Sequence, residues 1–210
     1  TGKSRNLESE RTIKVRDDAW ELVCEFVQDW GLRRHMLAVA AAMRFYAELL
    51  GQDSNYWETV GLVHDFDWEI HPGLDRHPID GAQILRERGW DEETIRVVLS
   101  HYTEGTGVVR EKPVDFALMA NDEITGLIVA TTLVRPSKNI ADVSLKSIRK
   151  KWKNQNFAAG VDREDVEKAT AEFSDACFDG QLDLWTHINN VLSAMQRFAA
   201  ELELDGRMAL

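Results

Sequence analysis

The stretch Glu58–Asp67, with the sequence ETVGLVHDFD, guides the interpretation of the rest of the chain. An apolar run of Val60, Leu62 and Val63 leads directly into the pair His64–Asp65. This pattern predicts that the pair lies at the inner end of a buried helix, where its polar groups need partners. A hydrogen-bonded pair at a helix end is one interpretation, and a pair of metal ligands is the other.

Further histidines and an aspartate occur where they could face the same pair. Imidazole and carboxylate groups suit divalent transition metals, and several of them together can hold two ions. Because buried His and Asp are rarely tolerated without partners, the whole series favours metal binding more strongly than the pair alone. These additional candidate ligands are His35, His77, His101 and Asp122.

The two residues of the pair are adjacent, so on a regular helix they would point about 100° apart. Both reach one centre only near the end of the helix, where the chain turns. A carboxylate has two oxygens, so Asp65 could bridge two ions while His64 binds one.

Apolar residues recur at steps of three and four along most of the chain, which predicts an all-α fold. No repeat, low-complexity tract or strand pattern interrupts them, and no proline- or glycine-rich linker divides the chain. We expect one domain over residues 17–210, preceded by a flexible polar segment over residues 1–16. The predicted helices are 17–30, 32–50, 56–66, 79–88, 91–102, 113–134, 141–153, 162–178 and 181–204.

Several residues are predicted to mark the helix boundaries. Gly31 is expected to end the first helix, and Ser54 or Asn55 to cap the third. Asp91 is expected to cap the fifth helix, and Pro113 to open a long apolar one. His187 lies beside the apolar stripe of the last helix, where we expect a structural role. That stripe fits either the core or a dimer face.

The net charge of −11 argues against general nucleic-acid binding, which needs a basic surface. The longest apolar run, Met36–Met43, has eight residues and is far too short to span a membrane. No signal-peptide pattern opens the sequence. Cys24 and Cys177 are far apart and belong to no CxxC pair, so a reducing, cytoplasmic location is the simplest expectation.

One segment departs from the acidic character of the chain. Residues 135–153 contain seven basic residues and a single acid, Asp142. Such a segment could draw an anionic substrate toward a site by focusing the electric field. It could equally be a solvated helix face or a contact between subunits.

The order of His35, His64–Asp65 and Asp122 resembles the HD superfamily of metal-dependent phosphohydrolases. The segments HPIDGAQIL (His77–Leu85) and SHYTEG (Ser100–Gly105) resemble the branch that carries two further histidines. The resemblance covers about residues 32–134, roughly half of the chain. It implies an all-α HD helical bundle as the core, followed by a C-terminal helical extension over residues 135–210.

The resemblance implies two divalent ions, which could be iron, manganese, zinc, magnesium or nickel. The first ion would be held by His35, His64, Asp65 and Asp122, and the second by Asp65, His77 and His101. Metal ions at such a site lower the pKa of a water molecule, which can then attack phosphorus. Asp65 would act in catalysis as the bridge, and Asp67 would orient the water or shuttle a proton. Glu104 would either face the substrate or support a ligand, and both Asp67 and Glu104 could instead only form hydrogen bonds within their loops.

The expected substrate is a small phosphate ester, which includes nucleotides. Four cations are candidates for binding its phosphate group, namely Arg110, Lys112, Arg135 and Lys138. The HDIGK and GYP signatures of cyclic dinucleotide phosphodiesterases are absent, and Phe66 follows the HD pair here. Tyr102 stands where those enzymes have a second consecutive histidine, which argues against a third metal. The substrate class of those enzymes therefore does not carry over.

Two other functions fit the same ligands. The first is an HD-type di-iron oxygenase, which would show oxygen-dependent turnover. The second is a non-catalytic, metal-stabilised module that binds a nucleotide or a partner. The enzyme hypotheses are favoured because all the candidate ligands are present.

Overall fold

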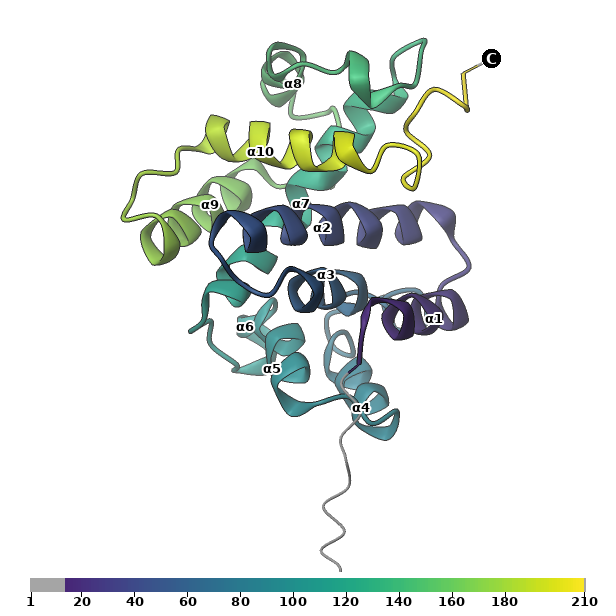
Figure 1. Cartoon of the computed structure of the whole chain (residues 1–210), viewed down its shortest axis with the longest axis vertical. Coiled ribbons are helices and arrows are strands. Elements are labelled where there is room, and N and C mark those ends of the chain that lie inside the picture. Colours follow the sequence, from purple (N-terminus) through teal and green to yellow (C-terminus); the bar gives the residue numbers. More distant parts are fainter. Residues whose placement is uncertain (1–13, 210) are drawn as a thin grey trace, which may run out of the picture.

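Ten α-helices and one 3₁₀ helix make up the part of the chain that this computed structural model describes, residues 14–209 (Figure 1). The predicted all-α fold is confirmed there, since Asn139 and Asp205 form only an isolated β-bridge. Most of the predicted flexible N-terminal segment lies outside the described residues. The elements are α1 (Arg16–Phe26), α2 (Trp30–Leu49), α3 (Ser54–Val63), α4 (Ile79–Glu87), α5 (Glu92–Ser100), α6 (Thr103–Thr106), α7 (Pro113–Leu133), η1 (Ile140–Asp142), α8 (Leu145–Trp152), α9 (Arg163–Cys177) and α10 (Leu184–Arg197).

The helices α2 and α7 form the centre of the fold. The alanine-rich α2 lies between α3 on one side and α10 on the other, and it also contacts α7 (Figure 1). Its middle, residues 36–43, is completely buried, which explains why this stretch has no polar face. The helix α7 contacts α2 and also packs against α9, so the C-terminal helices cover the HD-like core.

By length and composition alone, α7 could cross a membrane, but 56% of its most apolar stretch is buried inside the fold. Its buried residues include Leu118, Ile124 and Ile128, which belong to the hydrophobic core. Its apolar character is therefore explained by burial among α2, α9 and α10.

Two predicted boundaries near the site are wrong, and the side chains of aspartates explain why. Asp29 accepts a hydrogen bond from the backbone N–H of Leu32 (2.7 Å) and starts α2, so Gly31 lies in the first turn of that helix instead of ending the previous one. Asp53 accepts from Asn55 and Tyr56 (both 3.0 Å), so neither Ser54 nor Asn55 caps α3. The Asp91 cap of α5 is confirmed.

The C-terminal helices are shorter than predicted. The basic segment contains η1 and then α8, which begins only after the capping residue Ser144. The last helix ends at Arg197, and the chain then folds back as a loop in which Leu202 and Leu204 are buried. Arg34 donates to the carbonyl oxygen of Leu202 (2.8 Å) and ties this loop to α2.

The structural role predicted for His187 is confirmed. Its Nε2 donates to the carbonyl oxygen of Ala120 (2.8 Å), so its Nδ1 accepts a hydrogen bond from the hydroxyl of Tyr46 (2.6 Å). The histidine is completely buried, and burial lowers the pKa of His187 to about 4. This network joins α2, α7 and α10 through groups that stay neutral at pH 7.

Stability should therefore fall in mild acid because of His187. Its pKa is lower in the folded state than in the unfolded state, so its contribution is complete above about pH 6.5 and is lost as the pH falls toward 4. We expect this loss to reach about 3 kcal/mol and to be absent in His187→Gln. Denaturant unfolding of both metal-free proteins at pH 7 and 4.5 measures it. Identical pH slopes for the two proteins would contradict the assignment.

Candidate metal centre

Three separate elements bring the first group of ligands together. His35 comes from α2, Asp122 comes from α7, and His64 and Asp65 follow directly after the last residue of α3. The Nε2 of His35 lies 3.0 Å from Asp122 Oδ1 and 3.5 Å from Asp65 Oδ2. The Nε2 of His64 lies 3.4 Å and 3.5 Å from the same two oxygens. Four ligand atoms therefore surround one point.

A second group of ligands uses the other oxygen of Asp65. Its Oδ1 lies 3.2 Å from His77 Nε2 and 3.5 Å from His101 Nε2, and the two histidine nitrogens are 3.1 Å apart. His77 precedes α4, and His101 caps the C-terminal end of α5. The carboxylate of Asp65 thus lies between the two groups, with one oxygen toward each.

The outer ring nitrogens of three of these histidines are held by acceptors. The Nδ1 of His64 donates to Gly61 O (2.7 Å), that of His77 donates to Asp67 Oδ1 (2.8 Å), and that of His101 donates to Val98 O. With the proton on Nδ1, each Nε2 presents a lone pair to the centre, which is the arrangement of metal-binding histidines.

His35 follows the same arrangement through a hydroxyl group. The hydroxyl of Thr125 donates to Asp122 O (2.8 Å), so it can accept from the Nδ1 of His35 at 3.3 Å. At the centre itself, the buried Nε2 of His64 makes no hydrogen bond. A buried polar atom without a hydrogen bond needs a compensating partner, and a divalent cation between these donors fits that need.

The electrostatics of the site favour positive charge between the carboxylates. Burial alone would lower the pKa of His35, but its bonds to Asp122 and Asp65 outweigh burial and raise this pKa to about 10. The pKa of His77 is raised to about 9 in the same way by Asp65 and Asp67. Burial would raise the pKa of Asp65, but the surrounding histidines hold it well below its usual range. A metal ion would supply the charge that protons supply here.

The structure does not support the expected role of Asp67 in orienting water. Its side chain is completely buried behind His77, where Oδ1 accepts from His77 Nδ1 and Oδ2 accepts from the backbone N–H of Gly81 (3.1 Å). Asp67 therefore fixes the orientation of a ligand instead of contacting the reacting atoms. A carboxylate in this position also makes the imidazole a stronger ligand.

Substitutions that disturb the contact between Asp67 and His77 should weaken the second metal site. In Asp67→Asn the amide cannot accept both hydrogen bonds, and in Gly81→Ala the new Cβ would lie 2.5 Å from Asp67 Cγ. We expect both variants to lose about 10- to 100-fold in affinity for the second ion, with the first ion retained. Competition with a chelator measures both affinities. Equal weakening of the two ions would argue against a specific role at His77.

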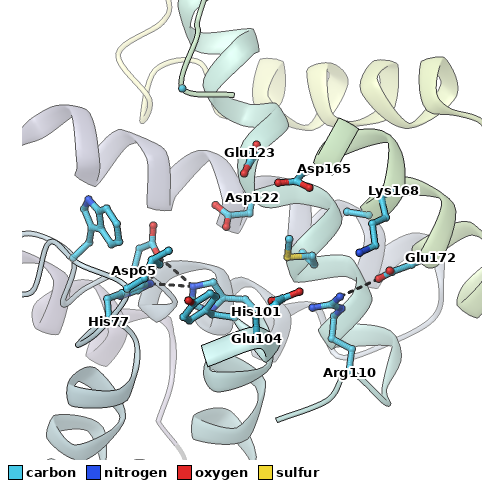
Figure 2. Close-up of a pocket in the computed structure, with 16 residues that line it drawn as sticks. Asp65, His77, His101, Glu104, Arg110, Asp122, Glu123, Asp165, Lys168 and Glu172 are labelled. Atoms are coloured by element: carbon cyan, nitrogen blue, oxygen red, sulfur yellow. Dashed lines mark hydrogen bonds and ion pairs between the residues drawn. The ribbon is translucent and has the colours of Figure 1, made fainter. Parts of the chain in front are cut away.

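A cavity of about 580 Å³ opens beside the ligands (Figure 2). Among the predicted residues, Glu104 and Arg110 line it together with Asp65, Asp122 and the two histidines of the second group. Its volume falls in the range of small-molecule sites. The ligand groups are thus accessible to a substrate larger than phosphate itself.

Three predicted phosphate-binding cations do not line this cavity. The Nζ of Lys112 pairs with Glu93 (2.8 Å) at the start of α5. Arg135 and Lys138 follow the C-terminal end of α7, which lies eleven residues or about 16 Å along the helix from Asp122. Their nearness in sequence to the ligand helix was misleading, because the helix carries them away from the site.

The wall that α9 contributes to the cavity was not predicted from the sequence. Asp165, Lys168 and Glu172 line the cavity opposite the second group of ligands (Figure 2). Their spacing of three and four residues places them on one face of a helix, but nothing in the sequence indicates which helix faces the metal centre. Glu123, beside Asp122, also lines the cavity, and burial raises the pKa of Glu123 to about 7.

The sequence was compared with protein families, curated proteins and solved structures. Residues 32–125 match the HD domain, a range that contains all six candidate ligands. A tRNA (cytidine(56)-2'-O)-methyltransferase of Picrophilus torridus is 25% identical over 148 residues, which are 69% of this chain and 42% of that protein. The chain thus spans less than half the length of this curated relative, and no solved structure matches it. Since the ligand order and the helical fold agree with the match, residues 32–125 of this chain form an HD domain.

Proposed function

We propose that this chain is a metal-dependent phosphohydrolase that cleaves the phosphate ester of a small molecule. The observation that supports this most directly is the position of Asp65, whose two oxygens face two separate groups of ligands. Two divalent ions bound there would lower the pKa of a water molecule and neutralise charge on the phosphoryl oxygens. The HD domain agrees with hydrolytic metal chemistry.

The proposed function assigns a role to each group of residues at the site. His35, His64, Asp65 and Asp122 would hold one ion, and Asp65, His77 and His101 the other. Glu104 is exposed in the cavity and forms no ion pair within residues 14–209, so its carboxylate is free to contact the substrate. The surrounding side chains Trp68, Leu74 and Met119 reduce the access of water to the substrate.

The proposal extends to the compartment in which the protein acts. Cys24 and Cys177 are both free thiols in the structure. Free cysteines of this kind are usual in a reducing environment, which supports a cytoplasmic location.

Metal analysis followed by a turnover screen tests the function. Protein purified anaerobically without chelator should contain two metal ions per chain and should release phosphate from small phosphomonoesters. Oxygen-dependent turnover with iron and without phosphate release would replace the proposal with a di-iron oxygenase. Bound metal with no turnover on a broad phosphate panel would indicate a binding module instead. Failure to bind metal after reconstitution would exclude both enzymes.

A further inference from the structure

The cavity has a second wall that lies away from the metal ligands. We call it the distal wall, and it comprises Glu104 of α6, Arg110 of the loop before α7, and Asp165, Lys168 and Glu172 of α9. Figure 2 shows Arg110, Asp165, Lys168 and Glu172 across the cavity from Asp65 and His77, and Glu104 between them and next to His101. The three α9 residues lie outside the matched range 32–125, so this part of the wall comes from the chain's own extension, while Glu104 and Arg110 lie inside the range.

Two members of the distal wall neutralise each other. Arg110 and Glu172 form an ion pair at 3.1 Å, and the guanidinium also donates to Ser100 O and Thr103 Oγ1 at 3.2 Å each. These contacts connect α9 to the segment that carries His101. The ion pair therefore stiffens the wall, and the positive charge of Arg110 is already neutralised by the carboxylate of Glu172.

Backbone contacts fix the position of α9 as well. The carboxylate of Glu123 accepts a hydrogen bond from the backbone N–H of Asp162 (2.8 Å), the residue that caps α9. The buried Arg163 donates to four carbonyl oxygens of residues 154–161. The distal wall is thus held in place before a ligand binds, which favours selectivity.

The other three members offer more acceptors than donors. Glu104, Asp165 and Lys168 are exposed, and none forms an ion pair or a side-chain hydrogen bond in the described part of the chain. The two carboxylates provide about eight acceptor positions against three donors of the ammonium group. These three residues together therefore carry a net negative charge, and they favour hydrogen-bond donors on a ligand.

This charge distribution restricts where anionic groups can bind. A phosphate group is attracted to the metal centre, while a second phosphate at the distal wall would face two carboxylates against one lysine. Contacts between like charges are unfavourable even when they are partly solvated. A second anionic group on the substrate is therefore selected against.

We propose that the substrate is a phosphomonoester whose body carries hydrogen-bond donors, either hydroxyl groups or an ammonium group, and no second anionic group. Asp165 and Glu104 bind these donors, and Met119 and Tyr102 contact the carbon skeleton between the two ends of the cavity. This inference rests on the proposed phosphohydrolase function and specifies its substrate class.

A matched panel of four phosphate esters tests this class. Glycerol phosphate carries hydroxyl groups, phosphoethanolamine carries an ammonium group, propyl phosphate carries neither, and the bisphosphate of 1,3-propanediol carries a second anion. We expect kcat/KM for one or both donor-bearing esters to exceed that of the other two at least tenfold, since an ester without donors displaces water from the two carboxylates without replacing its hydrogen bonds. Calorimetric binding of the corresponding phosphonates to the metal-loaded protein gives a second readout, and the better donor-bearing ester distinguishes hydroxyl from ammonium recognition.

Variants of the distal wall complete the test. Asp165→Asn should lower the preference for donor-bearing ligands, and Asp165→Lys should shift it toward the bisphosphate, both in binding and in kcat/KM. Glu167→Gln, on the same helix but outside the cavity, should change neither. Equal binding and turnover of all four esters, or a preference for the bisphosphate in the unmodified protein, would overturn the inference alone. Absence of binding and turnover for every phosphomonoester would overturn the proposed function with it.

Discussion

Replacing Asp65 with asparagine is expected to remove both metal ions from the chain and to abolish turnover. The two carboxylate oxygens lie 3.2–3.5 Å from histidine nitrogens of both ligand groups, and an asparagine side chain offers only one oxygen and no negative charge. The loss in kcat should reach at least the roughly 10²- to 10³-fold that follows removal of one electrostatic stabiliser. Elemental analysis and a turnover assay on the same preparation measure the two effects.

Two companion variants make this result specific. His101→Gln removes a ligand of the second group alone, so we expect one ion per chain to remain. Asp75→Asn changes an exposed carboxylate of the loop before His77 and should leave both ions in place. If Asp65→Asn kept one ion with unchanged affinity, Asp65 would not be shared between two sites.

The ligands could be recognised from the sequence because their chemistry is carried by residue type and order. Histidine and aspartate within apolar helices need partners, and six such residues converge in the structure. The role of Asp67 could not be predicted, because it depends on how the chain turns after Asp65. There, the backbone N–H of His71 bonds to Asp67 O (2.8 Å), and the loop directs Asp67 behind His77.

The cavity was less predictable than the ligands for a similar reason. Hydrophobic periodicity identified α7 and α9 as helices, but it does not show which faces meet in space. Only the packing of α9 on α7 places Lys168 in the wall of the cavity, whereas Arg135, closer in sequence to Asp122, lies beyond the far end of α7. The helix boundaries could be predicted only approximately because they depend on capping. One hydrogen bond to the side chain of Asp29, for example, decides where α2 begins.

Gly61→Ala is expected to destabilise the fold and to weaken the first metal site. The helices α2 and α3 approach so closely that a Cβ on Gly61 would lie 2.7 Å from Ala40 Cα and 2.9 Å from Ala40 N. These are backbone atoms, so no change of side-chain conformation relieves the contact. Overpacking costs about 1–3 kcal/mol, which outweighs the gain of up to about 1 kcal/mol from the higher helix propensity of alanine.

The effect should reach the metal centre because the two helices carry different ligands. His35 lies on α2, and His64 follows α3 with its Nδ1 bonded to Gly61 O (2.7 Å), so separating the helices moves these ligands apart. We expect a lower melting temperature, by about 2–4 °C for each kcal/mol of net destabilisation, and a larger loss of affinity at the first ion than at the second. Gly126→Ala on α7 is the matched control, because its Cβ would meet only a methyl group of Val161 at 3.3 Å. If both variants melted alike and bound metal alike, close approach of α2 and α3 would not be what aligns His35 with His64.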